Sequence, residues 1–166
     1  MWLLFVVAVA LAFFAYRSAT TTTVVLVRHA EKELGTIEDA PLSAAGERRA
    51  EHLAEMFGEV SGPGRIEAIY VSDTRRAQQT AMPLAMRLGL RPTVLPATQV
   101  DAVVSRILHD QRGGRALVVG HSNTLPEIVH RLTGVSIPPI GEDQYDDVYV
   151  VTVPTFGKSS VLHLKY

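Results

Sequence analysis

Cysteine is absent from the 166 residues of this chain. This absence excludes a disulfide scaffold, thiolate-bound zinc, a cysteine nucleophile and lipid attachment through an N-terminal cysteine. An excess of one charge is also missing, because 16 Lys and Arg residues nearly balance 17 Asp and Glu residues. The sequence therefore predicts neither a basic face for nucleic acid nor an acidic tail. The length is typical of one domain with a hydrophobic core.

The N-terminal segment differs in composition from the rest of the chain. Residues 2–16 form an uncharged apolar run, which ends at Arg17 before the threonines of residues 20–23. Export signals have apolar cores of ~7–15 residues and spanning helices need ~20, so the run lies between the two. We expect residues 1–19 to be a hydrophobic signal or membrane anchor, and residues 20–166 to form the folded domain. A buried N-terminal core helix is the alternative.

The expected location of the protein follows from this segment. Phe13 or Arg17 would stand three residues before the available cleavage sites, where small residues are usual, and this favours an uncleaved anchor. We therefore expect a membrane-associated or exported protein of the periplasm or cell envelope, with the membrane as a partner through the uncleaved segment. Arg17 also leaves a cytoplasm-facing orientation open.

The remaining chain alternates short apolar runs with helical patterns, which predicts an α/β domain with a mostly parallel sheet. Residues 24–27 and 116–119 are continuously apolar, as in central strands covered on both faces. Further strands are expected at residues 66–71, 93–95, 148–153 and 161–164, the last two as a hairpin at the sheet edge. Helices are expected from Ser43 to near Gly58, from Ser72 or Asp73 to Leu88, over residues 100–108, and from a Thr124–Glu127 capping box to near Gly134.

Polar side chains follow three of the predicted strands. They are Arg28-His29, residues 72–76 and residues 121–123. The carboxyl ends of parallel strands meet at one edge of the sheet, where ligands bind. Arginines beside histidines, without a Gly-rich loop that carries lysine, suit a phosphoryl group because guanidinium forks match phosphate oxygens.

His29 is the predicted nucleophile of this cluster. A neighbouring arginine disfavours the imidazolium and should keep His29 neutral. Arg28, Arg76 and His121 would then stabilise the transferred phosphoryl group, so neither a metal nor another cofactor is required. Considered alone, each of these residues also fits a purely structural role, as a hydrogen-bonded histidine or a solvated arginine.

Two other chemistries are weaker fits to the same residues. Metal ligation by His29, Glu31 and His121 is opposed by the adjacent arginines. A nucleophile elbow at Gly120-His121-Ser122 lacks its second glycine, because position 124 is threonine.

The motifs themselves resemble those of the histidine phosphatase superfamily. Residues 27–32 (VRHAEK) are similar to its R-H-G or R-H-A motif, residues 72–81 (SDTRRAQQTA) to S-x-x-x-R-A-x-x-T-A, and residues 119–123 (VGHSN) to the final G-H element. Residues 42–46 (LSAAG) are similar to its L-T-x-x-G. The resemblance, which covers the chain from Thr23 onward, implies a three-layer α/β/α sandwich of the phosphoglycerate mutase type. It implies a phosphohistidine on His29, a second catalytic histidine at His121, and phosphate contacts from Arg28 and Arg76, with Arg75 at the rim.

One departure from the family concerns the general acid. Many members carry an acidic residue in an insert between the second and third motifs, and that insert is almost absent here. The candidates are Asp101 and Glu31, although Asp101 also fits a helix cap and Glu31 a solvated loop. The short chain disfavours mutase activity. The acidic segment 141–147 receives no role.

These observations predict a metal-independent phosphatase that hydrolyses phosphomonoesters through a phosphohistidine on His29. Its substrate would be a phosphorylated small molecule or a phosphoprotein. One alternative is a protein phosphohistidine phosphatase, which needs less help from a general acid because a phosphoramidate leaves more easily than an alkoxide. The other is a non-catalytic, membrane-tethered module that binds phosphate.

Overall fold

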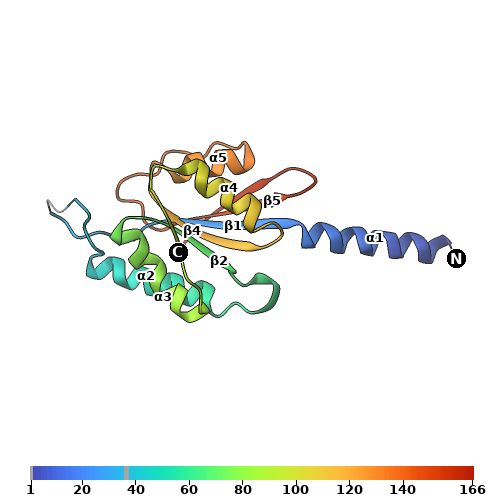
Figure 1. The fold of residues 1–166 in the computed structure, drawn as a ribbon, viewed down its shortest axis with the longest axis horizontal. Coiled ribbons are helices and arrows are strands. Elements are labelled where there is room, and N and C mark those ends of the chain that lie inside the picture. The colour runs from blue at the N-terminus through green and yellow to red at the C-terminus, as the bar shows by residue number, and fades with distance from the viewer. Residues whose placement is uncertain (1, 36–37) are drawn as a thin grey trace.

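The strands of the domain form one six-stranded sheet in the order β3-β2-β4-β1-β5-β6 (Figure 1). The computed structural model describes residues 2–35 and 38–166. The strands are β1 Thr21–Arg28, β2 Ala68–Ser72, β3 Thr93–Leu95, β4 Arg115–Gly120, β5 Asp147–Pro154 and β6 Ser160–Lys165. β1, β2, β3 and β4 are parallel, whereas β5 and β6 are antiparallel to their neighbours. This arrangement confirms the mostly parallel sheet and the terminal hairpin at its edge.

Helices cover both faces of this sheet. Within the described residues, five α-helices and one 3-10 turn follow in chain order: α1 Trp2–Ala19, α2 Ala44–Gly58, η1 Gly62–Gly64, α3 Arg75–Leu88, α4 Val100–Asp110 and α5 Leu125–Thr133. Helices α2 and α3 lie on one face and α4 and α5 on the other (Figure 1). The three-layer α/β/α sandwich is therefore confirmed.

The apolar run of β1 is buried because both of its faces meet helices. Val25 and Val27 pack into the core beneath α2 and α3, whereas Val24 and Leu26 pack into the core beneath α4 and α5. Alternate side chains of a strand point to opposite faces, so a strand between two helical layers needs apolar residues at every position. This packing fixes β1, and with it the position of Arg28 and His29 at its end.

Helix α2 begins as predicted, and its start is tied to the segment after His29. The Ser43 hydroxyl accepts a hydrogen bond from the Gly46 N–H at 3.2 Å, and the Ser43 N–H donates to the Glu31 carbonyl at 2.9 Å. A Cβ at Gly46 would lie 2.1 Å from that carbonyl oxygen. Only glycine permits this approach of α2 to the segment that carries the histidine.

Two predicted helix caps are wrong because their side chains bond elsewhere. Helix α3 is preceded by Thr74, not capped by Ser72 or Asp73. The Ser72 hydroxyl contacts His121, and the Asp73 carboxylate accepts from the Ala97 N–H. Before α5, the Thr124 hydroxyl accepts from the His121 N–H and forms no capping box. Side chains near the sheet edge thus stabilise the loops there in place of the helix ends.

Helix α1 extends away from the sheet as a continuation of β1 (Figure 1). Several of its large apolar side chains are exposed, among them Trp2, Leu4 and Phe5. The alternative of a buried core helix is therefore wrong for these residues. Within the part of the chain that the structure describes, no helix combines the length and apolarity needed to cross a membrane.

Candidate active site

The polar residues that follow β1, β2 and β4 meet at one edge of the sheet. β4 ends at Gly120, whose carbonyl accepts a hydrogen bond from the His29 N–H at 2.9 Å. The ring centroids of His29 and His121 are 5.2 Å apart, in an edge-on arrangement. Both histidines and Arg28 are buried. The structure therefore brings together residues that are up to 93 positions apart in the sequence.

His29 is held in the protonation state that a nucleophile requires. Its Nδ1 lies 2.8 Å from the Ala30 carbonyl oxygen, which only accepts, so Nδ1 carries the proton and Nε2 keeps its lone pair. The pKa of His29 is lowered to about 3, first by burial and then by the nearby charges of His121, Arg76 and Arg28. The predicted effect of a neighbouring arginine is present, but burial is the larger cause.

His121 lies against the end of β2. Its Nε2 is 2.8 Å from the Ser72 hydroxyl, which is 3.0 Å from the Thr74 hydroxyl. Burial, followed by the charges of Arg76 and Arg28, lowers the pKa of His121 to about 4. Two neutral imidazoles beside two permanent guanidinium charges form a site whose fixed charge is positive.

The two predicted phosphate arginines each keep a buried donor unpaired. The Nε atoms of Arg28 and Arg76 have no hydrogen-bond partner among the residues described. An unpaired buried donor costs about 1–3 kcal/mol, and an oxyanion would relieve that cost. Arg76 has otherwise a long ion pair with Asp39, with Nη1 3.8 Å from Oδ1. These donors fit an anion with several oxygens, such as a phosphoryl group.

Thr80 links the two halves of the site. Its hydroxyl accepts from the Ala30 N–H at 2.9 Å and donates to the Arg76 carbonyl at 2.7 Å. Thr80 is completely buried. The segment after His29 is therefore fixed to the first turns of α3, from which Arg76 extends.

Neither predicted general acid is free to act in this cluster. Although burial alone raises the pKa of Glu31, the Arg49 guanidinium holds that pKa below its usual value through two hydrogen-bonding nitrogens. Asp101 is exposed and pairs with Arg131 of α5. Asp101 does not cap α4 either, because the residue at that cap is Gln99. Among the described residues, no three His, Asp or Glu side chains gather as metal ligands would.

The sequence analysis missed one contact of the site, in which Arg28 binds backbone carbonyls of the segment before β5. Arg28 Nη1 donates to the carbonyls of Gly141, Glu142 and Gln144 at 2.8–3.2 Å. The guanidinium carbon also lies 4.2 Å from the centre of the Tyr145 ring. The only sequence signal for this contact was a run of acidic residues near the third motif, and such runs are usually plain surface loops.

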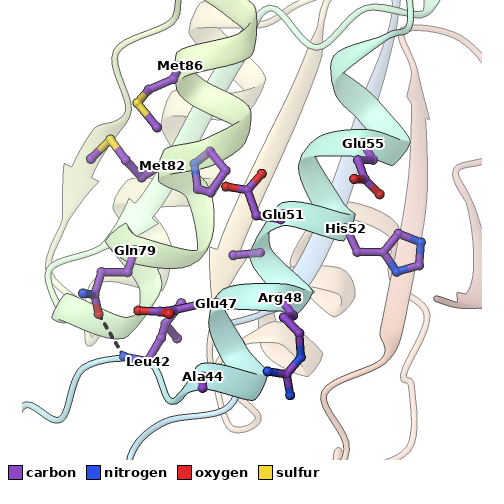
Figure 2. Close-up of a pocket in the computed structure, with 12 residues that line it drawn as sticks. Leu42, Ala44, Glu47, Arg48, Glu51, His52, Glu55, Gln79, Met82 and Met86 are labelled. Carbon is purple, nitrogen blue, oxygen red and sulfur yellow. Dashed lines mark hydrogen bonds between the residues drawn. The ribbon is translucent and has the colours of Figure 1, made fainter.

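A groove away from this cluster lies between α2 and α3. It has a volume of about 710 Å³ and is bordered by glutamates of α2 and methionines of α3 (Figure 2). Figure 2 shows Glu47, Glu51 and Glu55 on one helix and Met82 and Met86 on the other. None of the four predicted site residues lines it. This groove is therefore separate from the predicted phosphoryl site.

The low pKa values predict how stability responds to pH. The unfolded chain binds a proton on His29 near pH 6.5, whereas the folded chain does so only near pH 3, so the unfolded state holds more protons between these values. Stability should therefore rise with pH through this window and be fully present above pH 6.5. We expect the free energy of unfolding to fall by about 2 kcal/mol from pH 7 to pH 5 on account of His29.

Urea unfolding at both pH values measures this difference, and His29→Asn serves as the matched control. The variant should show a smaller pH dependence than the parent. An equal pH dependence in both proteins would contradict the assignment to His29.

The comparisons with known proteins agree with the site. Residues 24–99 match the model of the histidine phosphatase superfamily (branch 1). Over these residues, which include Arg28, His29 and Arg76, the chain is similar to that superfamily. No curated protein is similar enough in sequence to match the chain.

Several solved structures share the fold. The protein histidine phosphatase SixA complexed with tungstate superposes with a TM-score of 0.71 at 22% identity, covering 86% of this chain and 96% of the other. A mycobacterial glucosyl-3-phosphoglycerate phosphatase gives 0.67 at 16% identity, with 85% and 97% covered. The alpha-ribazole phosphatase of Shigella flexneri gives 0.66 at 17% identity, with 87% and 96% covered. These structures show the fold of the chain, and the match over residues 24–99 agrees with the resemblance of the sequence motifs.

Proposed function

We propose that this protein hydrolyses phosphomonoesters through a phosphohistidine on His29. The observation that carries the proposal is the pairing of a neutral, buried His29 with two arginines whose buried Nε donors lack partners. A phosphoryl group bound by Arg28 and Arg76 would satisfy these donors and meet the lone pair of His29 Nε2.

The reaction would proceed in two displacements. Nε2 of His29 attacks phosphorus as the ester P–O bond breaks, and the leaving alcohol takes up a proton. Water then attacks the phosphohistidine, the P–N bond breaks, and inorganic phosphate leaves. The proton stays on Nδ1, which donates it to the Ala30 carbonyl throughout, so the ring returns to its starting state. Arg28, Arg76 and His121 stabilise the negative charge of the transferred group.

Trapping the intermediate tests this route. Protein quenched during turnover of a ³²P-labelled phosphomonoester, in the presence of a chelator, should carry label that is stable in base and lost in acid. That stability pattern is typical of a phosphorus–nitrogen bond. Two results would contradict the proposal. One is turnover with a protein-bound label that is stable in acid, and the other is turnover without any protein-bound label in parent protein quenched within milliseconds.

A second candidate is a protein phosphohistidine phosphatase. It is favoured because Glu31 and Asp101 are both engaged in ion pairs, and a phosphoramidate depends less on a proton donor than an alkyl ester does. The similarity to SixA, whose name gives it this activity, points the same way. Rates measured side by side on a phosphohistidine protein and on phosphomonoesters distinguish the two. Binding of phosphate esters without any turnover would instead support the non-catalytic module.

The location of the protein is a separate proposal. We keep residues 1–19 as a membrane anchor or export signal because α1 exposes large apolar side chains away from the domain. Cell fractionation of the chain with and without residues 2–19 tests this. Equal recovery of both forms in the cytosol would contradict it.

A further inference from the structure

A carboxylate outside the predicted site residues lies directly on the phosphoryl site. Glu142 Oε2 accepts a hydrogen bond from Arg28 Nη2 at 3.1 Å, and Glu142 Oε1 accepts one from the Ser122 hydroxyl at 3.1 Å. Ser122 directly follows the second histidine, His121. Glu142 therefore spans two of the three chain segments that form the site.

The backbone of Glu142 is held at three carbonyls of its segment, while its side chain is exposed. Arg28 Nη1 donates hydrogen bonds to the backbone carbonyls of Gly141, Glu142 and Gln144. The Glu142 side chain, in contrast, is 85% exposed. The carboxylate can therefore move aside for a ligand, but it cannot move further from Arg28 than the length of its own side chain.

A bound phosphoryl group would change the surroundings of this carboxylate. A phosphoryl oxygen on Arg28 competes with Glu142 Oε2 for Nη2, because both are anionic acceptors of the same donor. The displaced carboxyl group then lies beside the bound phosphoryl group, on the exposed side of the site. This position places the carboxyl group where a leaving group would depart to solvent.

We propose that Glu142 is the general acid and general base of this enzyme, in place of the missing insert. In the first step its carboxyl proton passes to the ester oxygen as the P–O bond breaks, and an alcohol leaves. In the second step the resulting carboxylate takes a proton from the water that attacks the phosphohistidine, as the P–N bond breaks and phosphate forms. The inference rests on the proposed phosphohistidine route.

Substrates that differ in their leaving group test this role. Aryl esters such as 4-nitrophenyl phosphate expel a stable phenolate and need little protonation, whereas alkyl phosphates need a proton. Glu142→Gln keeps the size of the side chain and removes its acid. We expect Glu142→Gln to change kcat/KM for 4-nitrophenyl phosphate by less than about threefold and to lower it about 100-fold for an alkyl phosphate.

The matched control is Asp143→Asn, which removes a negative charge from the neighbouring residue of the same segment. This control should leave the rates on both substrates unchanged. The alkyl phosphate should also lose the basic limb of its pH profile in Glu142→Gln alone. Thermal unfolding of both variants near the parent temperature would show that the fold is intact.

Three results would overturn the inference. An equal loss of kcat/KM on both substrates in Glu142→Gln would mean that Glu142 has only a structural role. Tighter phosphate binding and faster turnover of both substrates in that variant would mean that Glu142 only competes with phosphate for Arg28. If the parent hydrolyses the aryl ester through His29 and either of these results is found, only the role of Glu142 fails. A parent inactive on every ester would remove the proposed function and this inference together.

Discussion

Replacing His29 by asparagine should lower kcat for phosphomonoesters by about 10⁴-fold or more, because the variant lacks the nitrogen that attacks phosphorus in the covalent route. His29 Nε2 is the only one of its ring nitrogens with a free lone pair, since Nδ1 donates to the Ala30 carbonyl. Asparagine can place an N–H donor near the position of Nδ1 and thus keep that hydrogen bond. It offers no nitrogen lone pair at the position of Nε2. The variant therefore separates chemistry from folding.

Steady-state kinetics together with thermal unfolding measure the result. The asparagine variant should unfold within a few degrees of the parent, because the hydrogen bond to Ala30 is kept. It should still bind inorganic phosphate through Arg28 and Arg76. Activity of the variant within tenfold of the parent would mean that His29 is not the nucleophile. The reaction would then proceed by direct attack of water on phosphorus.

The convergence of the site could be predicted from the sequence because it depends on strands with a clear pattern. The runs at residues 24–27 and 116–119 are apolar at every position, which predicts central parallel strands and a common edge for their carboxyl ends. Once these strands are adjacent, Arg28, His29 and His121 must lie together. The order of the strands was not predicted and is known only from the structure.

The general acid could not be predicted because it depends on how loops fold over the edge of the sheet. Glu142 reaches Arg28 across 114 residues of sequence, and nothing in the spacing indicates this contact. Asp101 and Glu31 were plausible by position in the chain, but Arg131 and Arg49 extend from other helices and bind them. A carboxylate's role depends on its nearest cation, and that neighbour is known only from the folded structure.

The two arginines of the site should differ in what they contribute to stability. Arg28 is buried and donates to three backbone carbonyls and the Glu142 carboxylate. A lysine has a single nitrogen and cannot reach all four acceptors, so Arg28→Lys loses several of these hydrogen bonds. Among the described residues, the Arg76 side chain has only the 3.8 Å ion pair with the half-exposed Asp39. We therefore expect Arg28→Lys to cost about 2–4 kcal/mol of stability and Arg76→Lys less than about 1 kcal/mol.

Both variants should nevertheless lower kcat/KM by about 10²–10³-fold, because lysine lacks the planar fork that binds two phosphoryl oxygens. Urea unfolding and kinetics on the same preparations measure the two effects separately. Equal stability losses would show that the carbonyl contacts of Arg28 contribute little to the fold. The expected inequality has a functional consequence: the guanidinium that binds phosphate also holds the backbone of Glu142, so an Arg28 variant should lose the proton donor along with the phosphate contact. The loss for Arg28→Lys should then be greater on alkyl than on aryl phosphates, whereas the loss for Arg76→Lys should be the same on both.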